Sequence, residues 1–294
     1  MDTTNHLELE FIEMEPHLSV FGIGVKGELA IKYLADNKVE NTNLCIINHK
    51  EKKTVLHQSG GIKQLALSSF ESDALNKLLN DECVIILVVD SECINNLKLA
   101  IQIGEVLKKQ KYPVISVILN EIATEQERSI SNEMYTLINL SNSYLVLPTS
   151  KTPSNKVETN VLNSVSSLIE LILYDFPTNM CMGIDHADVI TILSETKESF
   201  NNNQLPINIC YGFSTNPKSI YAVFNNAISR IKPTMSESCN VLVHVRINIE
   251  NYKYEELTST LEKIREQYKG DCYLAPKHDA NINNKEVHVT AFIT

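Results

Sequence analysis

Several features that would assign this chain to a large class of proteins are missing from its sequence. Basic residues are not in excess: 26 Lys and Arg stand against 36 Asp and Glu, which gives a formal net charge of −10. Proteins that bind nucleic acids need a basic surface that displaces counterions from phosphates, so this balance argues against that class. No apolar run approaches the length that crosses a bilayer, and the acidic stretch of residues 1–16 lacks the basic start of a signal peptide. We therefore expect a cytoplasmic protein without a nucleic-acid partner and without direct membrane insertion.

Paired cysteines and metal-ligand clusters are also missing. The chain has seven cysteines, an odd number, and none forms a C-x-x-C pair. Most lie in apolar strand contexts, which predicts reduced, buried thiols, while the setting of Cys93 predicts exposure. The eight histidines do not gather with cysteines at metal-ligand spacing, so we expect no metal site.

A glycine-bearing turn near the start of the chain is the first motif that points to a function. In LSVFGIGVKGELAIKYL, residues 18–34, an apolar strand is followed by Gly22, Gly24 and Gly27 and then by helical spacing of apolar residues. This G-x-G-x-x-G pattern is typical of phosphate-binding corners, where backbone N–H groups and a helix N-terminus face an anion. A dinucleotide site would add a carboxylate after the second strand. That strand ends in Asn48-His49-Lys50, so the oxidoreductase interpretation fails.

The first half of the chain alternates between expected strands and helices. Strands are expected at residues 18–23, 44–48, 83–89, 114–119 and 144–147, with a short run at 62–67, and helices at 24–37, 70–79, 94–110 and 124–140. Such alternation predicts an α/β protein with a doubly wound parallel sheet. Ligands of such sheets bind at the carboxyl ends of the strands, which places Gly24, Asn48, Asp90 and Pro148 around one rim.

The second half of the chain has a different pattern. Helices are expected at 156–174, 188–200, 217–231 and 252–268, and strands at 207–213, 240–249, 271–275 and 286–293. The last strand alternates strictly, which favours a partly antiparallel sheet. We expect a degenerate nucleotide-binding-type domain over residues 1–153, a central helix over 154–177 and a smaller α+β C-terminal domain over 178–294.

The order of these motifs resembles the FtsZ family, the bacterial tubulin homologues, over Leu18 to Thr294. VFGIGVKGELAIKYL is similar to the first strand and glycine loop of FtsZ, GIDHADVITILSE resembles its synergy-loop motif N-V-D-F-A-D-V, and the strand at 144–148 resembles its I-V-I-P segment. INICYGFSTN, SCNVLVHVRIN and EVHVTAFIT are similar to strands of its second domain. The resemblance implies an FtsZ/tubulin-like fold.

The resemblance also implies a mechanism. FtsZ binds GTP on its first domain and stacks head to tail, so that the synergy loop of one subunit completes the GTPase site of the next. The two acids of that loop correspond to Asp185 and Asp188, which would act in trans or at an interface. An alternative is that both only cap the helix that follows them.

The phosphate cradle of the family, G-G-G-T-G-T-G, is degenerate in this chain. It aligns with DSECINNLK, residues 90–98, which contains no glycine and supplies Asp90, Ser91, Glu92, Asn95 and Asn96. A cradle works because bare backbone N–H groups approach the phosphates. Ile94 and Leu97 are expected to obstruct that approach, and the two acids to repel the anion. Gly22, Gly24 and Gly27 remain as a remnant loop, and neither a bound cofactor nor a catalytic residue in cis is expected.

Two classes of function follow. The first is a non-catalytic, pseudo-GTPase FtsZ-like protein of the cytoskeleton or of cell division. It would act through head-to-tail contacts with FtsZ, with another FtsZ-like protein or with itself, either by capping FtsZ filaments or by assembling without nucleotide. The second is a divergent enzyme that binds and hydrolyses GTP through Gly22, Gly24, Gly27 and a rearranged 90–98 loop.

Overall fold

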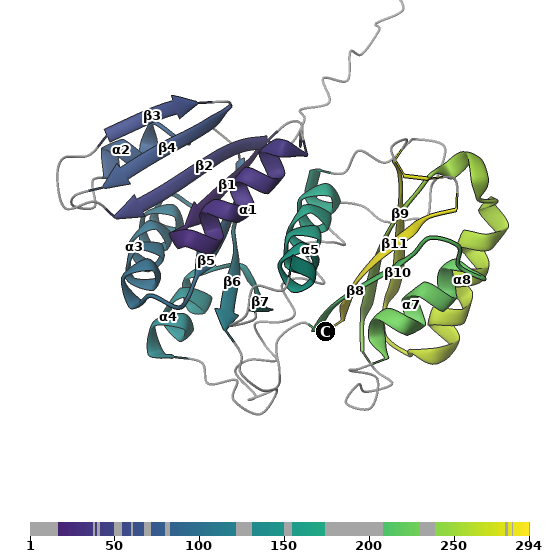
Figure 1. Cartoon of the computed structure of the whole chain (residues 1–294). Coiled ribbons are helices and arrows are strands. Elements are labelled where there is room, and N and C mark those ends of the chain that lie inside the picture. The colour runs from purple at the N-terminus through teal and green to yellow at the C-terminus, as the bar shows by residue number, and fades with distance from the viewer. Residues whose placement is uncertain are drawn as a thin grey trace, which may run out of the picture.

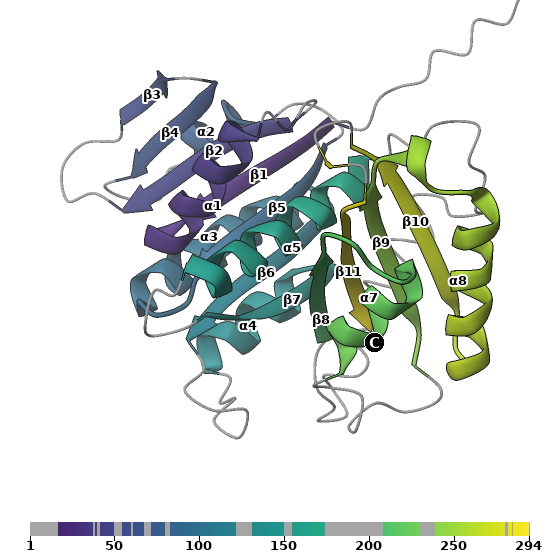
Figure 2. The ribbon, with the colours of Figure 1, turned by 45° about the vertical axis from the view of Figure 1, so that its right-hand side comes forward.

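Two β-sheets flank one long helix in the computed structural model of the chain (Figures 1 and 2). The structure describes residues 17–37, 39, 42–49, 55–59, 61–67, 72–79, 83–121, 131–149, 155–173, 208–229, 239–279, 282–283 and 285–293. The helix between the sheets is α5, Asn155–Leu173. The expected domain boundaries at residues 153 and 177 fall outside the described residues and stay predictions.

The elements that belong to the first sheet alternate along the chain. They are β1 (His17–Ile23), α1 (Gly24–Asp36), β2 (Thr42–His49), β3 (Val55–Ser59), β4 (Ile62–Leu67), α2 (Ser72–Asn76), β5 (Cys83–Asp90), α3 (Ile94–Lys109), β6 (Val114–Glu121), α4 (Asn132–Leu140) and β7 (Ser143–Thr149). Those of the second sheet are β8 (Asn208–Ser214), α7 (Ile220–Ile228), β9 (Val241–Ile247), a short 3-10 helix (Ile249–Asn251), α8 (Tyr254–Gln267), β10 (Cys272–His278) and β11 (Val287–Ile293).

The first sheet has the strand order β3-β4-β2-β1-β5-β6-β7. Six of its strands run parallel, and β3 pairs antiparallel with β4 at the edge. Because crossover helices cover both faces, the central strands are apolar on both sides, as in β5, where residues 85–89 are all buried. The expected α/β, doubly wound architecture is therefore confirmed.

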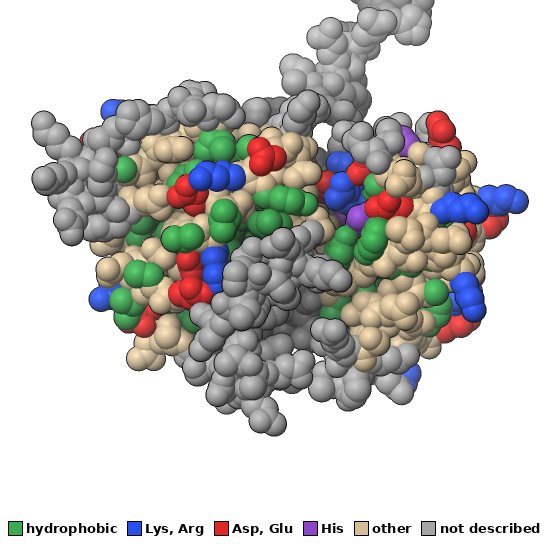
Figure 3. Space-filling model, viewed as in Figure 1, with side chains coloured by type: hydrophobic (Ala, Val, Ile, Leu, Met, Phe, Trp, Pro, Cys, Tyr) green, Lys and Arg blue, Asp and Glu red, His purple; other side chains and the backbone are tan. Residues whose placement is uncertain are grey.

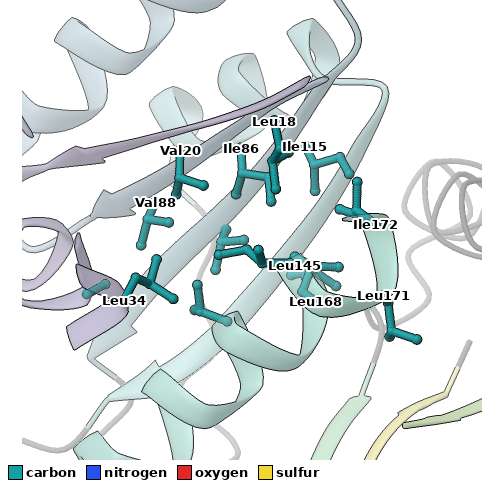
Figure 4. Close-up of a cluster of buried hydrophobic side chains, with 14 of the residues drawn as sticks. Leu18, Val20, Leu34, Ile86, Val88, Ile115, Leu145, Leu168, Leu171 and Ile172 are labelled. Carbon is teal, nitrogen blue, oxygen red and sulfur yellow. The ribbon is translucent and has the colours of Figure 1, made fainter. Parts of the chain in front are cut away.

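Each face of the first sheet has its own core. One face packs on α1 and α5, where Val20, Val88 and Leu145 of the sheet meet Leu34 of α1 and Leu168 of α5 (Figure 4). The other face packs on α2, α3 and α4. Residues Leu242, Ala275 and Phe292 of the second sheet join the first of these cores. Helix α5 thus carries one continuous core from the first sheet to the second.

The second sheet is mixed, with the order β10-β9-β11-β8. Strand β10 runs parallel to β9, while β11 is antiparallel to both β9 and β8. Helices α7 and α8 cover one face with an apolar core that includes Val287, Val289, Ala291 and Ile293. The opposite face of β11 is also buried, since Phe292 and Thr290 face α5. The predicted partly antiparallel α+β sheet is confirmed.

Some expected boundaries were wrong. Strand β3 was not expected, because residues 50–61 are largely polar; an edge strand does not need two apolar faces. Helix α2 covers five residues instead of the expected ten. In α4 the Ser131 hydroxyl accepts a hydrogen bond from the Met134 N–H, which starts the helix at Asn132. Residues 122–130 and the helix expected at 188–200 lie outside the described residues.

Candidate functional site

The carboxyl ends of the central parallel strands form the predicted rim. Ile23 of β1 is level with Ile47 of β2 and with Val89 of β5. The residues that follow, Gly24, Asn48 and Asp90, therefore lie next to one another at one edge of the sheet. Pro148 of β7 lies at the same edge, level with Asn120 of β6.

The glycine turn between β1 and α1 is tightly packed. A Cβ at Gly22 would lie 2.3 Å from the Gly27 carbonyl oxygen, and a Cβ at Gly27 would lie 2.6 Å from the Val88 carbonyl oxygen. Gly24 has a φ of +79°, and a Cβ there would lie 2.3 Å from the Asn96 amide nitrogen Nδ2. Backbone contacts at Gly22 and Gly27, and the positive φ and close Asn96 side chain at Gly24, thus account for the glycines without any ligand.

The Asp90 carboxylate occupies the N-terminus of α1. Its Oδ2 accepts a hydrogen bond from the Lys26 backbone N–H at 3.3 Å, and its Oδ1 accepts one from the Glu92 backbone N–H at 3.2 Å. The Asn96 side chain donates to the Asp90 carbonyl at 3.2 Å. Asp90 is only 5% exposed. A buried carboxylate therefore provides the negative charge that a helix N-terminus attracts.

The turn from β5 to α3 is joined to helix α1 and to strand β6. The Lys26 ammonium forms an ion pair with the Glu92 carboxylate. The Ser91 hydroxyl lies 3.0 Å from both the Leu119 carbonyl oxygen and the Asn120 side-chain oxygen. Asn95 is exposed. The five predicted loop residues, 90–92, 95 and 96, thus run from the end of β5 through the turn into the start of α3, beside the glycine loop.

One part of the obstruction argument was wrong. Leu97 is 3% exposed and belongs to the core beneath α3, because it points down toward the sheet from the first turn of the helix. Ile94, by contrast, is 49% exposed at the start of α3. Cys93 is exposed as predicted. The apolar periodicity of α3 itself assigns Leu97 to the buried face.

A second ion pair lies further along α1. Lys32 Nζ is 2.6 Å from Glu28 Oε1, and the Asn48 amide donates to Glu28 Oε2 at 3.4 Å. The hydrogen bond from Lys32 lowers the pKa of the Glu28 carboxyl below its usual range. The side chains that border the glycine turn are therefore paired within the chain.

Other predicted features have different outcomes. Asp185 and Asp188 lie outside the described residues, as do Ser150 and Lys151 after β7.

Among the residues that the structure describes, no group of three or more His, Cys, Asp and Glu could hold a metal ion. Burial raises the pKa of Cys45 to about 12 and that of Cys210 to about 11, as expected for inert thiols. In the same described part of the chain, no helix is long and apolar enough to span a membrane.

The contact between α5 and the second sheet contains a polar cluster that was not predicted. Glu170 of α5 places Oε2 3.5 Å from His244 Nε2 and 3.8 Å from Arg246 Nε, while an Arg246 Nη2 hydrogen bond to Asp279 Oδ2 measures 2.5 Å. Burial lowers the pKa of His244 to about 3 and raises that of Glu170. In Figure 3, charged and histidine side chains gather where the two halves of the molecule meet. We call Glu170, His244, Arg246 and Asp279 the joint cluster.

Further hydrogen bonds surround the joint cluster. The Tyr33 hydroxyl of α1 donates to Asn163 of α5 at 2.6 Å, and the Ser167 and Thr290 hydroxyls lie 2.9 Å apart. Tyr211 Oη is 2.5 Å from His288 Nδ1, whose Nε2 lies 2.7 Å from Glu286 Oε1. The sequence contains a signal for this polar contact. Asn and Ser residues recur on one side of α5, and polar residues alternate with apolar ones in β9.

The combination of a doubly wound parallel sheet, a long helix beside it and a second mixed sheet defines an FtsZ/tubulin type of fold. Solved structures agree. FtsZ from M. jannaschii, solved as an empty dimer, matches with a TM-score of 0.74 and 16% identity over 96% of this chain and 89% of that one. CetZ from Methanosaeta thermophila gives 0.64 and 11% over 95% and 86%.

A third match widens the set. TubZ from Bacillus thuringiensis serovar israelensis, solved as GDP-form protofilaments, matches with a TM-score of 0.54 and 12% identity over 95% of this chain and 86% of that one. No protein-family model matches the chain, and no curated protein sequence does. The resemblance to FtsZ is confirmed at the level of the fold.

Proposed function

We propose that this chain is a non-catalytic protein of the FtsZ-like cytoskeleton that acts through head-to-tail protein contacts without bound nucleotide. The observation that carries the proposal is the Asp90 carboxylate on the N-terminus of α1. In this fold a phosphate would need the backbone donors beside the glycine turn. Here the buried Asp90 carboxylate, which is negatively charged like a phosphate, accepts the hydrogen bonds of the Lys26 and Glu92 backbone N–H groups.

The residues at the rim do not fit a nucleotide polyphosphate. An added phosphate would meet Asp90, and two like charges at about 4 Å repel by roughly 4 kcal/mol at an effective dielectric of 20. Each charge-assisted hydrogen bond that the phosphate fails to form loses roughly 1.5–3 kcal/mol. The Lys26 ammonium, which could offset these losses, is paired with Glu92. Because each 1.4 kcal/mol is about tenfold in affinity, even part of this sum removes useful binding.

The interaction role rests on what proteins of this fold do. FtsZ of M. jannaschii has been solved as a dimer and TubZ as protofilaments. By the resemblance, the face that bears Asp185 and Asp188 would meet the next subunit. The partner would be FtsZ, another FtsZ-like protein or a second copy of this chain, in the cytoplasm and in division or a related filament process. In the capping version, the two acids orient the attacking water on a nucleotide held by the partner.

The first experiment measures nucleotide content. The protein is purified under native conditions and denatured, the supernatant is analysed for guanine nucleotides, and GTP is titrated by calorimetry. TubZ, whose solved form holds GDP, is the parallel control. We expect nucleotide from the control only, and no heat of binding from this chain. Nucleotide near one per chain would contradict the proposal and support the divergent GTPase, whose hydrolysis Asp185→Ala and Asp188→Ala would reduce.

The second experiment addresses the contacts. Asp185→Ala and Asp188→Ala variants are mixed with FtsZ, and filament mass and GTP turnover are followed by light scattering and phosphate release. For the capping version we expect the native chain to change both quantities and the variants to lose that effect. If native chain and variants leave FtsZ assembly and turnover equally unchanged, the capping version is wrong.

A further inference from the structure

The second sheet has a core of its own on the face that points away from α5. In β9, alternate residues from Val241 to Ile247 are buried against α7 and α8. The residues between them point to α5, where Leu242 joins the apolar core and His244 and Arg246 lie near Glu170. Because the core on α7 and α8 does not include α5, we expect the second sheet to stay folded when its contact with α5 is broken.

Helix α5 belongs mainly to the first sheet. Figure 4 shows Leu168 and Ile172 of α5 beside side chains of that sheet, in one buried cluster. The second sheet adds three buried apolar side chains to this cluster: Leu242, Ala275 and Phe292. Other contacts across the same boundary are polar, among them the pair of Ser167 and Thr290 hydroxyls. Contacts with few buried apolar groups are those that open locally before a protein unfolds as a whole.

The polar part of this boundary is incompletely hydrogen-bonded. Glu170 Oε2, His244 Nδ1 and Arg246 Nε are buried atoms without a hydrogen-bond partner among the described residues. The Glu170 carboxylate lies 3.5 Å from His244 Nε2 and 3.8 Å from Arg246 Nε, so the ionic contacts are long. His244 is 2% exposed. Water would satisfy all three atoms if the boundary opened, which lowers the free energy of the open form relative to a fully satisfied contact.

Charged or titratable groups line the boundary around His244 on each element packed there. They are Tyr33 of α1, Glu170 of α5, Tyr211 of β8, Arg246 of β9, Lys277 and Asp279 at the end of β10, and Glu286 and His288 at the start of β11. Burial, together with the positive charges of Arg246 and Lys277, lowers the pKa of His244 to about 3. Its one ionic partner among the described residues is Glu170. The closed boundary therefore holds His244 neutral.

We propose that this boundary is a proton-sensitive switch, in which proton uptake by His244 separates α5 from the second sheet while both sheets stay folded. In the open form His244 reaches water and binds protons like a free histidine, so acid selects the open form. Glu170 acts in the opposite sense, because burial favours its protonated form in the closed boundary. The proposal is independent of the proposed function, since no nucleotide takes part in it.

The test uses a thiol placed inside the boundary. Ser167→Cys changes one atom of a side chain that is 2% exposed and lies 2.9 Å from the Thr290 hydroxyl. Cys45 in the core of the first sheet and Cys272 in the core of the second are natural internal controls. A thiol reagent is added at pH 7.5 and at pH 5.5, and mass spectrometry measures the modification of each cysteine. Each rate is divided by that of the unfolded chain at the same pH, which removes the effect of pH on the thiol itself.

The expected rates follow from the two titrating groups. Between pH 7.5 and 5.5, a change in pKa from about 3 to 6.5 at His244 raises the opening constant about tenfold, and Glu170 offsets part of this rise. We expect the normalised rate at the introduced thiol to rise about threefold or more, and more steeply with Glu170→Gln. His244→Gln removes the rise. His278→Gln, which changes an exposed histidine at the end of β10, leaves it unchanged.

Three results overturn the proposal. The first is a rate at the introduced thiol that is equal at the two pH values. The second is a rise that persists with His244→Gln or is lost equally with His278→Gln. The third is a parallel rise at Cys45 and Cys272, which would mean that acid unfolds the whole chain. Circular dichroism checks that each variant is folded, and Thr290→Cys, on the other side of the boundary, repeats the measurement if Ser167→Cys does not fold.

Discussion

Two buried carboxylates, one at the rim and one at the joint cluster, are held in different ways. Asp90 accepts backbone N–H groups at 3.2 and 3.3 Å. Glu170 Oε2 lies 3.5 Å from His244 and 3.8 Å from Arg246, and this oxygen makes no hydrogen bond to any described residue, although Ser166 of α5 hydrogen-bonds to the Glu170 side chain. The donors of Asp90 belong to the backbone of its own sheet edge. The ionic partners of Glu170 are side chains of the second sheet, so their distances from the carboxylate depend on how α5 packs on that sheet.

The comparison shows that burial alone does not define the role of an acid. At the rim, the donors are backbone N–H groups whose positions are fixed by the fold. At the joint, the charge is partnered by long ionic contacts, and burial raises the Glu170 pKa. We therefore expect the stability of the chain to depend on pH through the joint cluster.

The largest effect is expected at the glycine turn that supports Asp90. Gly22→Ala places a Cβ 2.3 Å from the Gly27 carbonyl oxygen, which forces the strand and helix apart. Overpacking of this kind costs roughly 3 kcal/mol of unfolding free energy. Gly61→Ala is the control: its φ of +79° is strained, but its Cβ meets no atom within 4 Å, so we expect a loss of about 1 kcal/mol. Urea denaturation measures both, and equal losses would mean that the turn is not tightly packed.

A pH series tests the joint. His244 is buried with a pKa of about 3, against 6.5 for a free histidine. Between these values the unfolded chain binds the proton and the folded chain does not, so unfolding free energy is full above about pH 6.5. It falls with acidification by up to about 1.4 kcal/mol per pH unit.

Glu170 acts in the opposite sense at the joint. Its raised pKa makes the folded chain bind a proton more readily, which reduces the slope at the acid end. The lowered pKa of His288 adds to the effect of His244. We expect His244→Gln to flatten the profile of urea midpoint against pH. A native profile as flat as that of the variant would show that His244 is not held neutral.

Direct removal of each charge compares the two carboxylates. Asp90→Asn turns one acceptor into a donor that faces a backbone N–H, and an unsatisfied buried donor costs about 2 kcal/mol. Glu170→Gln leaves Arg246 bound to Asp279, so we expect a loss below about 1 kcal/mol at neutral pH. The urea midpoints of the two variants show which substitution lowers the unfolding free energy more. A larger loss for Glu170→Gln would reverse the comparison.

The smallest effect is expected at the surface of the rim. The side chains of Lys26 and Glu92 are 20% and 38% exposed, and ion pairs near water contribute about 0–1 kcal/mol. A double-mutant cycle with Lys26→Met and Glu92→Gln measures the coupling at low and high salt. We expect a small coupling that high salt weakens; a coupling as large as the Asp90 effect would make this pair the main support of the turn.

The sequence predicted most of the fold because its pattern is local. Buried parallel strands are apolar on both faces. In the crossover helices between them, apolar residues recur every three to four positions, so the strands and the helices could both be predicted from the sequence. The alternation of the last strand predicted the partly antiparallel second sheet in the same way. Strand β3 was missed because an edge strand carries little apolar signal, and α2 was overextended because its apolar residues continue past Asn76.

The sequence predicted where the candidate site lies in the sheet, but not the contacts between its residues. The rule for parallel sheets placed Gly24, Asn48 and Asp90 together, since register alone determines it. The bond from the Lys26 N–H to Asp90 joins residues 64 positions apart and depends on the direction of one side chain in a turn. The polar residues of α5 and β9 are visible in the sequence, but which of them meet depends on how α5 packs on the second sheet, and the sequence does not show that.

The contact between Gly22 and Gly27 has a consequence for how motifs are interpreted across protein families. Carbonyl oxygens of the chain itself exclude a methyl group from both positions, and the positive φ of Gly24 favours glycine there, so the fold alone accounts for the pattern G-x-G-x-x-G. Residues 90–98 contain no glycine, and β5 and α3 on either side of this segment are nevertheless formed. A glycine motif of this kind therefore indicates the close approach of two backbones and does not by itself indicate a bound phosphate.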